Sequence, residues 1–223
     1  MRINPKSHAT IKVLTARRGG LFFCVREGLS PKIKIDFANF AMNKIDRANE
    51  METFDELKEI CRRACHERNA CKEGFEAMLL AENTAELMHV WRRWWEDVWE
   101  SKYADIMTER IATARGRLRR EMRQSDVFVN ESSERGLVIV CRPDRPIRVG
   151  GRAKCYVFGT AANVTATDHA QVYCRESGVR VTLRGYATGR VKAGDCRCYD
   201  RTLLKGTPDS VELHDQAKFE PSE

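Results

Sequence analysis

The chain has 223 residues, 42% of them hydrophobic, which is enough to bury the core of one large domain or of two to three small ones. This composition excludes a wholly disordered chain. The apolar stretches are much shorter than the ~20 residues that cross a bilayer, and the first residues lack the apolar core of a secretion signal. We therefore expect a folded protein that has no membrane segment and stays in the cytoplasm.

The formal net charge of +7 is distributed unevenly along the chain. Residues 1–50 carry a net charge of +6, residues 51–125 a net charge of −1, and residues 126–223 a net charge of +2. Concentrated positive charge attracts phosphate backbones or acidic protein surfaces, although a solvated face that keeps a protein soluble has a similar composition. The charge therefore leaves nucleic acid and acidic protein open as partners.

The nine cysteines are an odd number and lie within regular elements, which favours reduced thiols. Cys61, Cys65 and Cys71 lie near His66, and these residue types can bind zinc. Paired Cys-x-x-Cys motifs are missing, however, and Cys61 and Cys65 would share a helix face with apolar residues. We therefore expect core thiols and no metal site.

The first fifty residues have the pattern of a small basic β element. A glycine pair at 19–20 separates apolar runs at 11–14 and 21–25, which predicts a β-hairpin because glycine supplies the positive φ of a tight turn. Alternation of apolar and charged residues at 33–37 predicts a further strand.

From about residue 51 the apolar residues recur with the period of an α-helix. Thr53 and Glu56 have the spacing of a capping box, in which a hydroxyl and a carboxylate bind the first free amides of a helix. Asn83 and Glu86 have the same spacing. Apolar residues just after Gly74 predict a short helix between these two starts. We expect an α-helical domain over residues 51–125.

The helix that begins near Asn83 cannot run unbroken through the arginine-rich segment that follows it. A single helix over residues 84–123 would be about 60 Å long at ~1.5 Å per residue, too long for a compact domain of this size. We therefore predict a break near Ser101 or Gly116.

All four tryptophans lie on this helix. Trp91, Trp95 and Trp99 recur every four residues, which favours a core or an interface over a platform for stacking bases. Tryptophan is common at interface anchors, so a partner or a second copy of the chain could cover part of this face. Arg115 and Arg119 follow; they would either balance the negative end of a helix or contact nucleic acid, and we include them in the predicted interface.

From Val127 the apolar period changes from that of a helix to two. The four central apolar pairs begin at Val164, Val172, Val181 and Val191, at steps of 8, 9 and 10 residues, with Gly or Asp between them. Short strands at such regular spacing predict a β-solenoid that runs to about Phe219 and has these valines in its core. An irregular sandwich is the alternative, but its strands should be longer.

Basic residues recur at outward positions of the predicted solenoid. We predict that they form one binding face for a phosphate backbone or an acidic protein. These residues are Arg175, Arg180, Arg184, Arg190, Lys192, Arg197 and Arg201.

The sequence contains no motif that would carry catalysis or bind a cofactor. Asp168-His169 and His214-Asp215 each pair an imidazole with a carboxylate, but adjacent residues on a strand point to opposite faces. Gly-x-Ser-x-Gly and phosphate-loop motifs do not occur. We therefore predict a non-enzymatic protein with no catalytic residues and no cofactor. A glycan-directed enzyme is a distant alternative, because solenoids that cleave sugars are generally much longer.

Several segments together carry a family resemblance. They are Phe54-Asp55-Glu56-Leu57, Cys71-Lys72-Glu73-Gly74-Phe75, Thr84-Ala85-Glu86-Leu87, Val127-Phe128-Val129-Asn130-Glu131 and Asn163-Val164-Thr165-Ala166-Thr167-Asp168. In this order the chain resembles a set of uncharacterised proteins encoded by bacteroidete bacteria and their phages. The resemblance covers about residues 54–195 and implies a helical head, a short Val-x-Ala-rich solenoid tail and a mobile-element setting.

Together these patterns predict an α+β multidomain chain: a β element at 1–50, an α-helical domain at 51–125 and a short β-solenoid (β-helix) at 126–223. The leading functional hypothesis is a phage-type protein of the bacterial cytoplasm. It would dock on a host protein or ribonucleoprotein assembly, with an anti-CRISPR or similar counter-defence role as its sharpest form. A sequence-tolerant nucleic-acid-binding protein and a phage structural or accessory protein are the alternatives.

Overall fold

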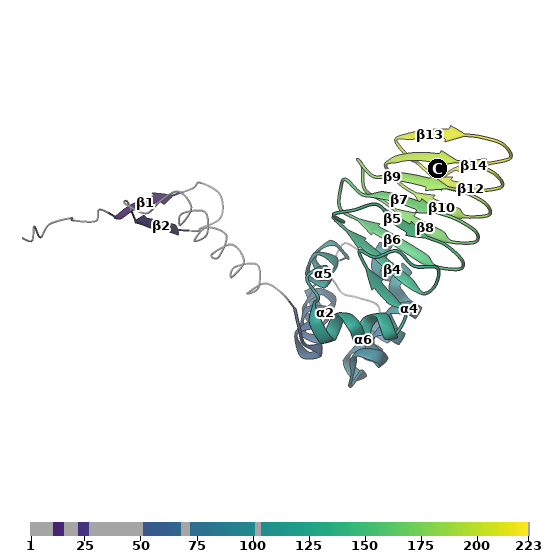
Figure 1. Ribbon diagram of the computed structural model, residues 1–223. Helices are drawn as coiled ribbons and strands as arrows, with labels where there is room; N and C mark the ends of the chain where they lie inside the picture. Colours follow the sequence, from purple (N-terminus) through teal and green to yellow (C-terminus); the bar gives the residue numbers. More distant parts are fainter. Residues whose placement is uncertain (1–10, 16–21, 27–50, 68–71, 101–103, 223) are drawn as a thin grey trace, which may run out of the picture. The chain divides into compact units, whose positions relative to one another are not determined.

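The computed structural model describes residues 11–15, 22–26, 51–67, 72–100 and 104–222 of the chain (Figure 1). The chain divides into two compact units, Met1–Glu50 and Met51–Glu223. In the first unit, β1 (Ile11–Thr15) pairs antiparallel with β2 (Phe22–Arg26). The strand expected at 33–37 lies outside the described residues.

The second unit begins with helices. They are α2 (Phe54–Glu67), α3 (Lys72–Leu80), α4 (Thr84–Glu100), α5 (Ala104–Ile111) and α6 (Gly116–Gln124). Both capping boxes form: Glu56 N donates to Thr53 Oγ1 at 3.2 Å, and Glu86 N donates to Asn83 Oδ1 at 3.0 Å. Because α4 ends at Glu100 and α6 begins at Gly116, the predicted break is confirmed, and it occurs at both of the alternative positions. The predicted short helix is α3.

The rest of the second unit is the predicted β-solenoid. From β4 onward its strands alternate between two parallel sheets, so that each of these coils contributes one strand to each sheet. The seven-stranded sheet, in spatial order, contains β14 (Lys218–Pro221), β12 (Leu203–Gly206), β10 (Thr188–Val191), β8 (Gln171–Cys174), β6 (Lys154–Phe158), β4 (Leu137–Cys141) and β3 (Val127–Val129). The five-stranded sheet contains β13 (Ser210–Leu213), β11 (Asp195–Cys198), β9 (Arg180–Leu183), β7 (Asn163–Ala166) and β5 (Ile147–Val149). Figure 1 shows these strands stacked from the helices toward the C-terminus.

The interior of the solenoid is narrow and apolar. Val164, Val172, Val181 and Val191 are at most 1% exposed, as the sequence predicted. They pack with small residues and cysteines between the two sheets. The sequence steps of 8, 9 and 10 residues are half coils, because consecutive valines alternate between the sheets.

One corner of each coil is a turn of four residues, which we call the corner tetrapeptide. Its copies are residues 150–153, 167–170, 184–187, 199–202 and 214–217. In each copy the fourth residue, an alanine or a threonine, donates its backbone N–H to the carbonyl oxygen of the first. The second residue is always Gly or Asp, with φ between 54° and 68°, because this left-handed conformation strains most other residues.

The aspartates of the corner tetrapeptides also join consecutive coils. The Asp168 carboxylate accepts the N–H of Gly151 at 3.1 Å, and Asp200 accepts the N–H of Gly185 at 2.8 Å. Asp215 in turn accepts the N–H of Asp200 at 3.3 Å. Each of these side chains thus satisfies a backbone donor one coil earlier in the chain.

The coils shorten along the solenoid. Lys154 pairs with Gln171, 17 residues later, whereas Thr188 pairs with Leu203, 15 residues later. The corner tetrapeptide keeps its length, so the opposite corner of the coil, which leads from the seven-stranded to the five-stranded sheet, is the part that becomes shorter. Gly206, which has φ +127°, lies at this shortened corner, where a Cβ atom would be 1.9 Å from Val191 O.

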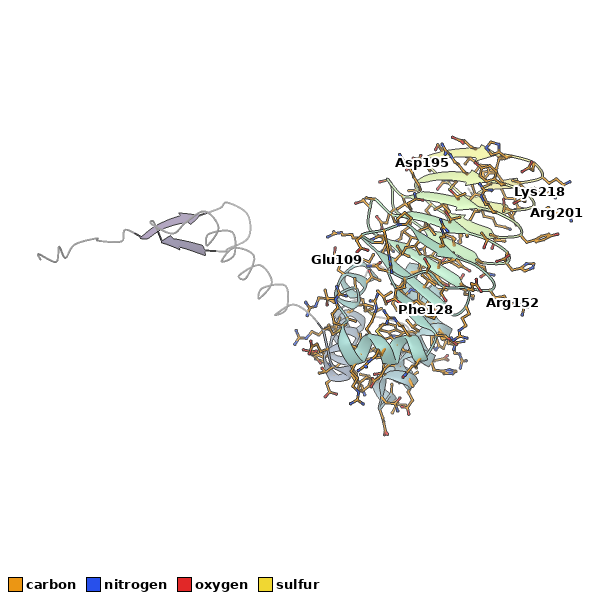
Figure 2. The ribbon with its side chains drawn as sticks, in the orientation of Figure 1. Glu109, Phe128, Arg152, Asp195, Arg201 and Lys218 are labelled. Atoms are coloured by element: carbon orange, nitrogen blue, oxygen red, sulfur yellow. The ribbon has the colours of Figure 1, made fainter. Side chains whose placement is uncertain are left out.

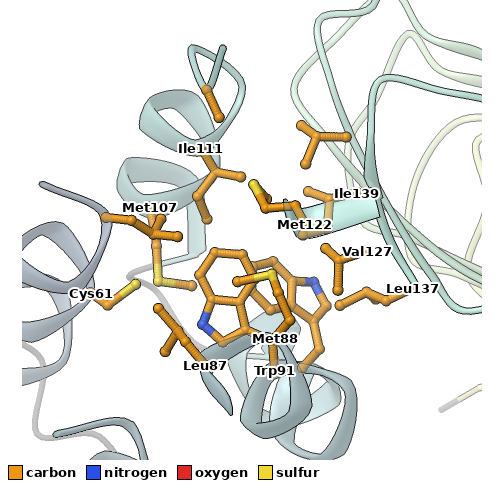
Figure 3. Close-up of a cluster of buried hydrophobic side chains, with 14 of the residues drawn as sticks. Cys61, Leu87, Met88, Trp91, Met107, Ile111, Met122, Val127, Leu137 and Ile139 are labelled. Carbon is orange, nitrogen blue, oxygen red and sulfur yellow. The ribbon is translucent and has the colours of Figure 1, made fainter. Parts of the chain in front are cut away.

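The helices pack on the outer face of the seven-stranded sheet at its β3 end, against β3, β4 and β6. All five residues of β4 are therefore buried: Val138 and Val140 face the solenoid interior, and Leu137 and Ile139 face the helices. This explains why the sequence does not alternate there. Figure 3 shows the resulting core, in which Met88, Trp91 and Met122 pack with Leu137 and Ile139.

The helices and the solenoid share one hydrophobic core. Residues 51–125 and 126–223, which the sequence suggested as two domains, lie together in the unit Met51–Glu223.

Candidate functional site

The three tryptophans of the predicted interface lie inside the unit. Trp91, Trp95 and Trp99 are 3%, 1% and 0% exposed. The Trp95 ring meets Phe158 at a centroid distance of 6.4 Å, and the Trp99 ring meets Tyr173 at 5.5 Å. The expectation of a core face is thus confirmed. The expectation of a surface for a separate partner needs correction, because the chain's own solenoid occupies that face.

Three residues of the predicted basic face hold the end of α4. Arg175 Nη1 donates to Trp99 O at 2.9 Å, where the helix carries negative partial charge. Arg190 Nη1 lies 2.9 Å from Glu100 Oε1, and the Arg190 guanidinium lies 5.7 Å from the centre of the Trp99 ring. Lys192 Nζ lies 5.0 Å from the same ring. These cations therefore stabilise the junction between α4 and the solenoid.

The other four basic residues lie elsewhere on the solenoid. Arg180 and Arg197 lie on the five-stranded sheet. Arg184 and Arg201 belong to corner tetrapeptides, and each guanidinium stacks on a tyrosine ring of an adjacent coil. The predicted single basic face is therefore wrong, because alternate strands belong to opposite sheets.

The outward surface of the five-stranded sheet is solvent-accessible; we call it the open face. Its exposed or half-buried side chains form two rows across the strands. One row is Asn163, Arg180, Asp195 and Ser210, and the other is Arg148, Thr165, Thr182, Arg197 and Glu212. Most of them line a shallow cavity of about 360 Å³.

The open face carries charges of both signs. Arg197 Nε lies 3.0 Å from Glu212 Oε2, and Ser210 Oγ donates to Asp195 Oδ1 at 2.6 Å. Arg180 is the backbone register partner of Asp195 on the next strand. The open face is thus flat, polar and of mixed charge.

A second cavity, of about 540 Å³, lies between the α5–α6 region and the first coil; we call it the arginine pocket. Its charged lining residues are Arg115, Arg119, Arg142, Arg145, Glu109, Glu131 and Asp144. The structure therefore brings together Arg115 and Arg119, the two arginines of the predicted interface. It adds Arg142 and Arg145, which sequence reasoning missed because coil closure brings them to the helices from a distant segment.

Glu131 is the most highly coordinated acid of the pocket. It accepts Arg119 Nε at 2.8 Å, and Arg123 donates Nε at 2.6 Å and Nη2 at 2.7 Å. Burial acts to raise the pKa of Glu131, but the hydrogen bonds from Arg123 and Arg119 outweigh it and hold the pKa below its ordinary value. Burial also lowers the pKa of Arg119, and Glu131 offsets only part of this effect.

The wall of the pocket is fixed by backbone contacts. Asn130 uses its side-chain amide to bind Cys141 on both sides: Nδ2 donates to Cys141 O at 2.8 Å, and Oδ1 accepts Cys141 N–H at 2.7 Å. This holds the end of β4, where Arg142 has a φ of +47°. Arg142 Nη2 then reaches Glu109 Oε1 at 2.8 Å.

The His-Asp pairs take part in coil stacking. The Asp168 carboxylate is held by the Gly151 amide and the Thr167 hydroxyl, which keep its pKa below the ordinary value. The His169 ring stacks on Tyr186 at 5.3 Å, and the His214 ring stacks on Tyr199 at 4.5 Å.

Cys61 is buried in the core, while the side chains of Cys65, His66 and Cys71 lie outside the described residues. Among the residues that the structure describes, no three metal-ligating side chains come together. No helix in the same described ranges is long and apolar enough to cross a membrane.

No protein-family model matches the sequence, and comparisons with curated proteins and with solved structures return no match. The functional proposal therefore depends on the geometry of this chain.

Proposed function

We propose that this protein is a non-enzymatic binding protein that docks a partner protein on its open face. The observation that carries the proposal is that this sheet presents two rows of exposed side chains to solvent while the helices pack on the other sheet. Flat parallel strands hold such rows in a fixed register, which limits the side-chain entropy lost on binding.

The mixed charge favours protein over nucleic acid as the partner. Asp195 and Glu212 would meet phosphates as like charges, whereas a phosphate backbone requires a largely positive surface. A folded protein with complementary charges can pair with Arg180 and Asp195 together. Electrostatic matching of this kind selects the partner and fixes the register of the complex.

The family resemblance supplies the setting of the proposal. Small proteins of mobile elements often act by occupying the surface of a host machine. We infer that the partner is a host protein or ribonucleoprotein assembly in the bacterial cytoplasm, and that occupation of its surface inhibits or retunes it. An anti-CRISPR or similar counter-defence role is the sharpest form of this proposal.

The test is an affinity capture from host cells, with and without nuclease, using wild-type protein, Arg180→Glu and Arg152→Glu. Figure 2 shows Arg152 on the side of the solenoid away from Asp195, so the second variant is a charge-matched control. We expect Arg180→Glu to weaken capture of the same partner about tenfold. Arg152→Glu and nuclease should leave capture unchanged. Inhibition of the captured assembly should saturate near one protein per target.

Three results would contradict the proposal. They are loss of the partner on nuclease treatment, equal weakening by both variants, and inhibition at far sub-stoichiometric protein with a chemically altered target.

A further inference from the structure

The arginine pocket shares no lining residue with the cavity of the open face. Its volume of about 540 Å³ lies within the range of ~300–1,000 Å³ that is typical of small-molecule sites. Its charged lining contrasts with the mostly apolar walls of such sites, which points to a small and highly charged ligand.

Positive charge exceeds negative charge at this site. Four arginines and three carboxylates line the pocket, and one of these carboxylates, Glu131, is shared with a further arginine, Arg123. Arg142 is paired with Glu109. Among the residues that the structure describes, the Arg145 side chain forms no ion pair or hydrogen bond, and it lies exposed at the rim of the pocket. The excess charge is therefore positive and accessible.

Arg119 supplies a further hydrogen-bond donor at the wall of the arginine pocket. Its Nε binds Glu131, but its Nη1 is buried and has no hydrogen-bond partner within the described part of the chain. A guanidinium N–H left without an acceptor is unfavourable. An anion bound in the pocket, which the same side chain lines, would supply an acceptor.

We propose that the arginine pocket binds the phosphate group of a small phosphorylated ligand. Arg142 and Arg145 would hold the phosphate from the rim, and Arg119 would donate to it from the wall. Phosphate suits this site because several guanidinium groups can each give parallel N–H donors to its oxygens. Asn130 keeps the β4 end of the pocket in place, so that little of the site must be ordered on binding.

The test is calorimetric titration of the full chain with inorganic pyrophosphate and with ATP, at constant ionic strength set by NaCl. If both ligands bind, the pocket recognises the phosphate groups themselves. If ATP alone binds, the pocket also requires contacts with the nucleoside. We expect Arg145→Ala to weaken binding about tenfold, the loss of one charge-assisted contact. Arg152→Ala, which removes an exposed arginine outside the pocket, should have no effect.

A second variant separates ligand binding from folding. Asp144→Asn removes a negative charge from the lining, so it should tighten pyrophosphate binding severalfold, a gain that misfolding cannot produce. The proposal is overturned if neither ligand binds, if chloride competes as well as pyrophosphate, or if Arg152→Ala weakens binding as much as Arg145→Ala does. Binding only to a single-stranded oligonucleotide would also overturn it, in favour of a nucleic-acid site.

Discussion

At the scale of single residues, Glu131 connects the helices to the solenoid. Its side chain is 16% exposed and binds Arg119 and Arg123 of α6 just after β3 ends. We expect Glu131→Gln to lower the free energy of unfolding by about 2 kcal/mol, because it leaves the Arg119 charge buried without a counter-ion. Urea unfolding would measure this loss. Glu212→Gln, which removes an exposed pair with Arg197, should cost less than ~1 kcal/mol. Equal costs would contradict the assignment.

The stabilising effect of Glu131 should depend on pH. Because its pKa is lower in the folded chain than the ordinary 4.5, the folded state binds the proton more weakly than the unfolded state. The contribution is complete above pH 4.5 and is lost as the pH falls through the folded-state pKa. The stability difference between wild type and Glu131→Gln should therefore shrink below that pH, and a constant difference would contradict this linkage.

The buried cysteines of the solenoid should not react with alkylating reagents in the folded protein. Burial raises the pKa of Cys174 and of Cys198 to about 11. At pH 8 we expect iodoacetamide to leave both thiols unmodified until urea unfolds the chain, as measured by peptide mass mapping. Since their ordinary pKa is 9.0, their contribution to stability is complete below pH 9.0 and is lost as the pH rises toward 11. Rapid modification of native protein would show that the coils open.

At the scale of elements, the corner opposite the corner tetrapeptide should tolerate change in the longer coils and not in the shortened ones. Gly206 and Gly178 both have positive φ, but an added Cβ would lie 1.9 Å from Val191 O at Gly206 and would meet nothing within 4 Å at Gly178. We expect Gly178→Ala to cost about 1 kcal/mol of backbone strain and Gly206→Ala at least about 3 kcal/mol, since the coil must also move apart. Urea unfolding of the matched pair tests this, and equal costs would show that the shortened corner is not tightly packed.

The helices and the solenoid strands were predictable because their signals are local. Thr53, Glu56, Asn83 and Glu86 define helix starts within four residues, and the valine spacing reflects the inward side of each strand. Which strand belongs to which sheet depends on how the coils close. The sequence pattern therefore did not show which basic residues lie on the same face of the solenoid. Arg142 reaches the pocket for the same reason, through contacts with segments distant in the chain.

At the scale of the whole molecule, one continuous core joins α4 to β4 and β6, and these strands also bound the solenoid interior. All four tryptophans lie on α4, so their fluorescence reports this junction. We expect thermal unfolding followed by tryptophan fluorescence and by far-ultraviolet circular dichroism to share one midpoint. Phe158→Ala, which removes a ring from the junction, should lower both midpoints together. A fluorescence transition that comes first would show that the helices detach from an intact solenoid.

The aspartate of the corner tetrapeptide has a consequence for synthesis. Asp168 and Asp200 each bind a backbone donor of the preceding coil, so a coil is completed by the one translated after it. The helices and β3 are translated before the later coils, and β4 and β6 then complete the core that these strands share with the helices. Each further coil pairs with residues only 15 to 17 positions earlier in the chain, so we expect it to form on a coil that has already been translated. The chain can therefore fold in the order in which it is made, with the helical end as the template.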